Sequence, residues 1–189
     1  RIDILLPLQE IDSKIYDINR RLTELPRELS ESEKKVTLAK KKVENVVESV
    51  NKLKVEHKNL QIEIQAIDEK ISKLKNSILQ SKKLKNEQYQ EILKEISQYE
   101  NTKKMHEERI IEIFYMLDDK EKERAREDEE YKQIAKEFEE TRKKIESESN
   151  RLKQILAESK QKREEIRNQI RQIDGSLLSI YERVLQSKG

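Results

Sequence analysis

The stretch that decides the fold is residues 43–78, VENVVESVNKLKVEHKNLQIEIQAIDEKISKLKNSI. Apolar residues recur along it at alternating spacings of three and four, and only His57 interrupts them. A strand would alternate every two residues, whereas this spacing places one narrow apolar seam along an α-helix. The same phase extends back to Leu8 without a slip, and 19 of its 21 positions are apolar. The sequence therefore predicts a helix over residues 8–79 that needs a partner helix to cover its seam.

The composition supports a long helix. Of the 189 residues, 42% are charged and 33% are hydrophobic, a balance that is also typical of disordered chains. The unbroken periodicity favours helix over disorder, and two glycines could not supply the turns of a sheet protein. Without cysteine the chain has no disulfide and no thiolate metal site, which fits a cytoplasmic location. No apolar run approaches the roughly 18–20 residues that span a bilayer.

Pro26 lies inside the predicted first helix and leaves two interpretations. Proline removes one backbone hydrogen bond and clashes with the preceding turn, so it can kink a continuous helix. Alternatively, Leu25 could end one helix and Pro26 begin another after a chain reversal. Because the seam keeps its phase across Pro26, a kink in one helix is the favoured interpretation.

The seam is interrupted at residues 80–87, where we expect the turn of a hairpin. Ser81 and Lys85 fall where apolar residues were due, and serine and asparagine are common at helix ends. A second seam then starts at Tyr89, predicts a helix over residues 88–173, and is apolar at 14 of its 23 positions. The sequence therefore predicts an all-α fold, a long two-helix antiparallel coiled-coil hairpin.

Charge agrees with this pairing. Residues 118–130 carry eight acids and four bases, whereas residues 34–42 carry five lysines and no acid. A turn centred near residue 84 sets residue i roughly opposite residue 168 − i, so the lysines lie beside the acids. Such exposed pairs contribute only about 0.2–1 kcal/mol each, so they select the register more than they stabilise the fold.

The predicted hairpin occupies residues 1–173, and a separate short element follows in residues 174–189. Asp174 and Gly175 break the second helix, and Ser176 is expected to cap a last helix from Leu177 to about Gln186.

Nothing in the sequence points to an enzyme, because a two-helix rod has no pocket in which catalytic groups converge. His57 and His106 both occupy seam positions, which allows a metal pair or a pH switch. The favoured interpretation is that they are polar seam residues that relax packing or fix register. We therefore predict a binding scaffold with no cofactor.

Two candidate interaction surfaces stand out. Around the second seam, the apolar cluster is wider than one partner helix can cover, and it leaves four side chains on the flanks or in solvent: Ile111, Phe114, Tyr115 and Met116. These side chains could be covered by a second copy of the chain in a homodimer or by another protein, or they could stay uncovered. A basic turn could contact RNA or DNA through three lysines: Lys82, Lys83 and Lys85. The helix over residues 142–171, with ten bases against five acids, could do the same. The alternative for both basic regions is a solvated, charge-mixed surface.

Three segments resemble a bacterial family of coiled-coil hairpin proteins that end in a cysteine-rich zinc ribbon. KNEQYQEILKEI at 85–96 is similar to the family's stretch after the turn, with matches at Asn86, Tyr89, Glu95 and Ile96. HEERIIEI at 106–113 resembles its acidic-then-aliphatic segment. LLSIYERVLQSKG at 177–189 resembles its helix before the ribbon, with matches at Tyr181, Glu182 and Arg183. LQEID at 8–12 and the Leu25-Pro26 pair also fit.

The resemblance implies protein partners. The family includes a flagellar regulator that acts as a chaperone of the enhancer-dependent sigma factor and is linked to flagellin messenger RNA. Its relatives are similar to adaptors of flagellar or type III secretion components. Zinc is implied only for a ribbon, and this chain has no zinc ligand of that kind. A purely structural coiled-coil arm is the remaining alternative.

Overall fold

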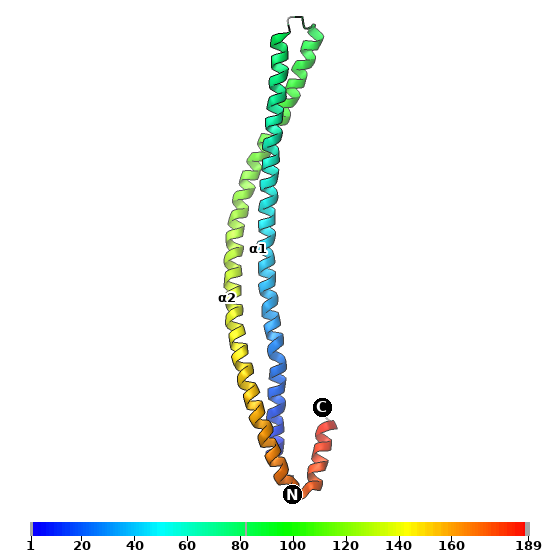
Figure 1. The fold of residues 1–189 in the computed structure, drawn as a ribbon, viewed down its shortest axis with the longest axis vertical. Helices are drawn as coiled ribbons and strands as arrows, with labels where there is room; N and C mark the ends of the chain where they lie inside the picture. Colours follow the sequence, from blue (N-terminus) through cyan, green and yellow to red (C-terminus); the bar gives the residue numbers. More distant parts are fainter. Residues whose placement is uncertain (1, 82, 188–189) are drawn as a thin grey trace. The chain divides into compact units, whose positions relative to one another are not determined.

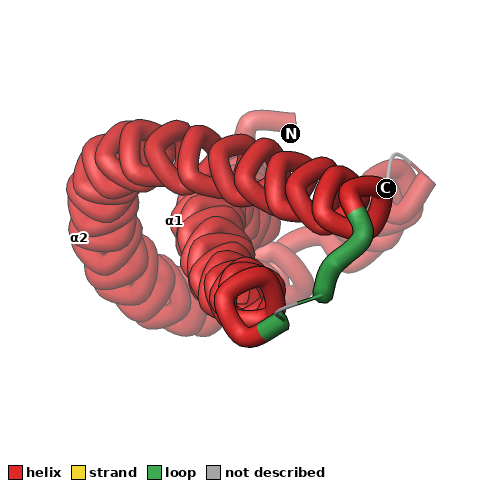
Figure 2. Tube along the Cα trace, turned by 90° about the horizontal axis from the view of Figure 1, so that it is seen from above, coloured by secondary structure: helices red, strands yellow, loops and turns green. Residues whose placement is uncertain are grey.

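The computed structural model describes residues 2–81 and 83–187. A short 3-10 helix, η1 (Ile2–Leu5), precedes two long α-helices, α1 (Leu6–Gln80) and α2 (Asn86–Ser187). Figure 2 shows the loop that joins them as the break between two helical tubes. Pro7 stands in the first turn of α1, where its missing N–H costs nothing. The predicted all-α hairpin is confirmed, with the turn inside the predicted interval 80–87.

Helix α1 continues through Pro26, so the chain does not reverse there. The continuous-helix interpretation is therefore correct and the reversal is excluded. Pro26 itself is exposed, whereas its neighbour Leu25 is almost fully buried. Because the ring lies on the outer face, the seam keeps its phase across the proline.

The contacts divide the chain into two compact units. The terminal unit comprises residues 1–37 and 133–189, and the turn unit comprises residues 38–132. In each unit a part of α1 and a part of α2 lie side by side and run in opposite directions (Figure 1). The end of α2 packs within the terminal unit, and the predicted division into residues 1–173 and 174–189 stays a prediction.

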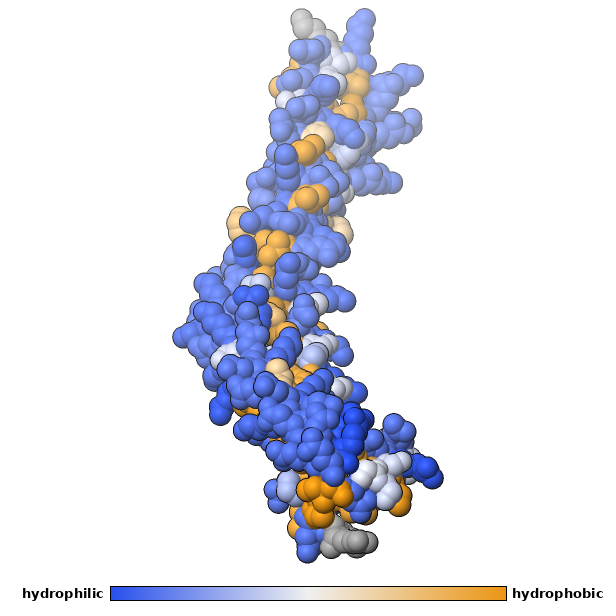
Figure 3. Space-filling view, turned by 60° about the horizontal axis from the view of Figure 1, so that its bottom comes forward, coloured by the Kyte–Doolittle hydropathy of each residue, from blue (hydrophilic) through white to orange (hydrophobic). Residues whose placement is uncertain are grey.

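The core is the predicted seam. Every buried apolar residue of α1 occupies one of its positions: Leu8, Ile18, Leu25, Ala39, Val46, Val50, Leu53, Ile67 and Ile71. On α2 the seam positions Ile96 and Ile113 are buried, and so is Ser159, whose small side chain suits a close approach of two helices. In the turn unit, Ile67, Ile71 and Ile96 form one cluster. On the face seen in Figure 3 most residues are hydrophilic, and hydrophobic residues form a broken line between them with a larger group near the bottom of the view.

Helix α2 is interrupted once. Asp174 has non-helical backbone angles, φ −154° and ψ 86°, and the C-terminal segment, residues 175–187, leaves the line of α2 there (red in Figure 1). The Asp174 carboxylate accepts hydrogen bonds from the Leu177 N–H at 3.1 Å and from the Ser176 hydroxyl at 2.7 Å. The cap of the last helix is therefore Asp174, and the prediction of Ser176 was wrong, because the Asp174 carboxylate accepts from the N–H three residues later and the Ser176 hydroxyl is itself bonded to Asp174.

Candidate interaction surface

Paired charges flank the seam of the turn unit and fix its register. Arg109 donates two hydrogen bonds to the Glu56 carboxylate, Lys103 Nζ lies 2.7 Å from Asp68 Oδ1, and Lys42 Nζ lies 3.5 Å from Glu130 Oε1. The Arg109 bonds lower the pKa of Glu56. Each pair joins α1 to α2 at positions whose numbers sum to 165–172, which confirms the predicted pairing rule of 168.

The four flank residues of α2 are all exposed. The exposed fraction is 55% for Ile111, 58% for Phe114, 73% for Tyr115 and 41% for Met116, whereas Ile113 between them is completely buried. Helical spacing explains this difference, because only Ile113 points along the seam. We call these four residues the Phe114 surface. The sequence predicted their position outside the seam, and their role in binding stays a prediction.

The two histidines have different partners. The His57 ring packs edge-on against Phe114, with ring centroids 5.2 Å apart. His106 Nε2 lies 3.1 Å from Glu63 Oε2. Within residues 2–81 and 83–187, no three side chains of the metal-binding types are grouped so that they could hold an ion. His57 therefore supports Phe114 from α1, and this geometry favours the packing interpretation of the seam histidines.

A shallow groove of about 550 Å³ lies on α1 in the turn unit. Its lining includes the exposed Val55, the partly buried Leu60 and the carboxylates of Glu48, Glu56 and Glu63. All three carboxylates have cationic or histidine partners: Lys52, Arg109 and His106. The groove thus offers apolar area with compensated charge, and its carboxylates are engaged rather than poised for chemistry.

Of the three lysines that the sequence predicted at the turn, the structure describes two. Lys83 and Lys85 are exposed, and their ammonium groups form none of the ion pairs found in the described part of the chain. Lys82 lies outside the described residues. The Lys85 backbone N–H donates to Gln88 Oε1 at 3.3 Å, which is one half of a capping box at the start of α2. Gln88 thus has a structural role at the start of α2.

The residues that carry the family resemblance lie in both units. Asn86 is the first residue of α2, Tyr89 is partly exposed on its first turn, and Glu95 is exposed. In the terminal unit, Tyr181 and Glu182 contact the rest of the unit, whereas Arg183 faces solvent.

The terminal unit contains a buried group of polar side chains that the sequence did not predict. The Asp12 carboxylate, whose side chain is only 9% exposed, accepts hydrogen bonds from Arg163 Nε and Nη2 and from the Tyr181 hydroxyl at 3.0 Å. We call these three residues the Asp12 cluster. Burial and the nearby carboxylate raise the pKa of Tyr181 to about 12. The LQEID motif was the only sequence signal that included Asp12.

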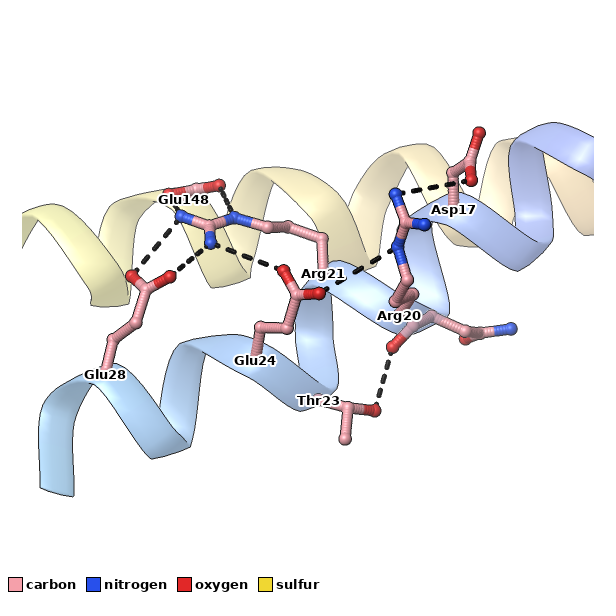
Figure 4. Close-up of polar contacts among 8 residues, drawn as sticks. Asp17, Arg20, Arg21, Thr23, Glu24, Glu28 and Glu148 are labelled. Carbon is pink, nitrogen blue, oxygen red and sulfur yellow. Dashed lines mark hydrogen bonds and ion pairs between the residues drawn. The ribbon is translucent and has the colours of Figure 1, made fainter. Parts of the chain in front are cut away.

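A second charged group in the terminal unit surrounds Arg21 (Figure 4). Its guanidinium donates to Glu148 of α2 at 2.7 Å and to Glu28 of α1, and it also pairs with Glu24 at 3.7 Å. The bonds from Arg21 lower the pKa of Glu148. Arg21 thus joins both helices at one level of the hairpin, as Arg109 does in the turn unit.

Two long helices that pair antiparallel through a seam of this kind define a coiled-coil hairpin protein. Among the described residues, no helix is both long and apolar enough to cross a membrane. The chain belongs to the family of the CT398-like coiled coil hairpin domain, which it matches over residues 8–189.

Solved structures agree on the fold. The structure of CT398 from Chlamydia trachomatis matches with a TM-score of 0.84 and 21% sequence identity, covering 99% of this chain and 77% of that chain. A protein from Mycobacterium smegmatis matches with a TM-score of 0.54 and 19% identity, covering 96% of this chain and 74% of that one. No curated protein matches the sequence. The likeness to these structures shows the fold.

Proposed function

We propose that the chain is a cytoplasmic protein-interaction scaffold, and that the Phe114 surface is where it holds a protein partner. A coiled-coil hairpin presents long helical faces and few concave sites, so contact with other proteins is the activity that its geometry favours. The observation that carries the proposal is the exposure of Ile111, Phe114 and Tyr115 within residues 110–117 of α2, where Glu112 is the one charged residue. A helical stretch that is apolar on nearly every side is usually buried.

Energetics support a covering partner. An apolar side chain left in water forgoes roughly 1.5–3 kcal/mol relative to full burial. These side chains are half to three-quarters exposed, so covering them would contribute a part of that amount for each. Beside them, Arg109 is paired with both Glu56 and Glu112, so its charge is compensated. An apolar helical partner therefore fits the surface.

The family resemblance suggests the identity of the partner. It implies the enhancer-dependent sigma factor, for which this chain would act as chaperone, or a flagellar or type III secretion component, for which it would act as adaptor. We therefore take the sigma factor as the first partner to test.

The test is a binding titration with purified sigma factor. The double variant Ile111→Ser with Phe114→Ser is expected to weaken binding at least about 10-fold, because each truncation removes part of a buried contact. A second variant, Ile111→Ser with Tyr115→Ser, leaves the contact between Phe114 and His57 intact. The matched control is Leu38→Ser with Ile62→Ser, which removes two equally exposed apolar residues of α1 in the same unit.

The outcomes separate the alternatives. Weaker binding in both surface variants, with unchanged circular dichroism and an unaffected control, supports the proposal. Equal loss in surface and control variants would mean that binding follows general hydrophobicity, and the Phe114 surface would then have no special role. If wild-type mass in solution is that of a dimer and the surface variants are monomers, a second copy covers the surface instead. Absence of any partner would leave a structural arm.

A nucleic-acid role is the second candidate, and the exposed Lys83 and Lys85 favour it. Both ammonium groups are free of ion pairs in the described part of the chain. Binding through them would weaken steeply as salt rises, because counterions are released from the phosphates. Lys83→Gln with Lys85→Gln should then reduce RNA binding, whereas the Phe114 surface variants should not.

A further inference from the structure

The helix break at Asp174 separates the C-terminal segment from the rest of α2. Its 13 described residues, 175–187, form a helix of a length that is marginal in water without tertiary contacts. An added Cβ at Gly175 would meet nothing within 4 Å, so the joint itself is not packed. Its helical state therefore depends on the contacts that the segment makes beyond the joint.

Those contacts are few and lie on one face. Leu178 is buried against Leu8 of α1 and Ile170 of α2, and Tyr181 packs at the edge of this cluster. On the opposite face, Ile180 and Val184 are exposed, and nothing in the described chain covers them. The segment thus packs on the terminal unit through the one face that carries Leu178 and Tyr181.

Two polar contacts complete the attachment. The Tyr181 hydroxyl donates to Asp12 at 3.0 Å, and Arg167 Nε donates to Glu182 at 2.6 Å. Neither contact is needed to join α1 to the part of α2 before Asp174, because Arg163 also donates two bonds to Asp12 of α1, and the Arg167–Glu182 bond lies within α2. The segment can therefore leave while the two long helices stay paired.

We propose that residues 175–187 form a strap that is folded only while it is docked on the terminal unit. Tyr181 and Glu182 fasten the strap, and Leu178 is its apolar anchor. Release converts the strap to disordered chain and uncovers the apolar residues Leu8 and Ile170. The fold thereby contains an apolar site that is closed in the docked state and open in the released state. This proposal does not depend on the proposed partner of the Phe114 surface.

The experiment is amide hydrogen exchange on the full chain. In the variant Tyr181→Phe with Glu182→Gln, exchange of amides 178–187 is expected to quicken roughly 10-fold or more, because the hydrogen bond of Tyr181 to Asp12 is lost and the acceptor of the Arg167 bond loses its charge. Exchange of amides 45–78 and 92–116 in the turn unit should not change. Glu148→Gln is the matched control, since it breaks an ion pair of the terminal unit that does not touch the strap.

A second variant keeps the test decisive. Leu178→Ser removes the anchor, and it should abolish protection of the strap and lower the helical signal by no more than the share of 13 residues in 189. Unchanged exchange of the strap in both variants would overturn the proposal. It would also be overturned if the turn unit lost protection in parallel, since the strap would then belong to one cooperative unit with the hairpin.

Discussion

Arg109 of α2 donates two parallel hydrogen bonds to Glu56 of α1, from Nε to Oε1 at 2.7 Å and from Nη2 to Oε2 at 3.2 Å. This side-by-side geometry matches the planar guanidinium to the planar carboxylate and fixes the level at which the two helices meet. Arg21 and Glu148 repeat the arrangement in the terminal unit, at 2.7 and 3.1 Å. The hairpin register therefore rests on arginine–glutamate pairs as well as on its seam.

These pairs predict an acid dependence of stability. The hydrogen bonds from arginine lower the pKa values of Glu56 and Glu148 from the usual 4.5. A lowered folded-state pKa contributes stability that is present above pH 4.5 and is lost as the pH falls through the folded value. The melting temperature of Glu56→Gln should therefore lie below that of wild type at pH 7, and the gap should close below about pH 4. A gap of constant size from pH 7 to pH 3 would show that the pair does not act through its charge.

Ile111 and Ile113, two positions apart on α2, should differ sharply in how much their substitution by alanine lowers stability. Ile113 is completely buried, so Ile113→Ala should cost about 2–5 kcal/mol in the free energy of unfolding. Ile111 is more than half exposed, so Ile111→Ala should change it by less than about 0.5 kcal/mol. Chemical denaturation measures both values. Similar losses in the two variants would place Ile111 in the core and remove it from the Phe114 surface.

The raised pKa of Tyr181 predicts that the terminal unit loses stability at alkaline pH. Its pKa rises from 10.0 to about 12, chiefly through burial and then through the hydrogen bond to Asp12. A raised folded-state pKa contributes stability that is complete below pH 10 and is lost as the pH rises towards 12. The difference in ultraviolet absorbance at tyrosinate wavelengths between wild type and Tyr181→Phe should therefore titrate near 12. A difference that titrates near 10 would mean that the Tyr181 hydroxyl is not held by Asp12.

Much of the fold was predictable because it follows from one pattern, the spacing of apolar residues along the seam. Each of the nine buried apolar residues of α1 lies on the seam that starts at Leu8, since a coiled coil buries one narrow stripe and leaves everything else in water. The turn followed from the interruption of that stripe. The exposure of Phe114 followed from the same geometry.

The C-terminal segment of the terminal unit was less predictable, because its contacts depend on the backbone angles of a single residue, Asp174. The φ and ψ angles of Asp174 direct the C-terminal segment back onto α1, and no periodicity in the sequence encodes that direction. Tyr181 and Asp12 are 169 positions apart, so their contact could not be inferred from spacing. Asp174 was overlooked as the cap because Ser176 is an equally good capping type.

A distance measurement tests the pairing within the turn unit. Spin labels at residues 43 and 125 should lie about 10–15 Å apart, as expected for two packed helices. Both labels should be placed on the same chain, diluted with unlabelled protein so that contacts between chains do not contribute. An intramolecular distance above roughly 40 Å would contradict the hairpin and indicate helices that pair between chains.

The central claim, that the Phe114 surface contacts a protein partner, has a direct spectroscopic test. The chain contains two phenylalanines, the exposed Phe114 and the half-buried Phe138 on the seam. Fluorophenylalanine labelling thus gives two fluorine resonances, which Phe138→Leu assigns. In the free protein a soluble paramagnetic agent should broaden the Phe114 resonance more than that of Phe138. Addition of the enhancer-dependent sigma factor should shift the Phe114 resonance and protect it from the agent, with Phe138 unshifted. A bound complex in which Phe114 stays unshifted and fully accessible would contradict the account.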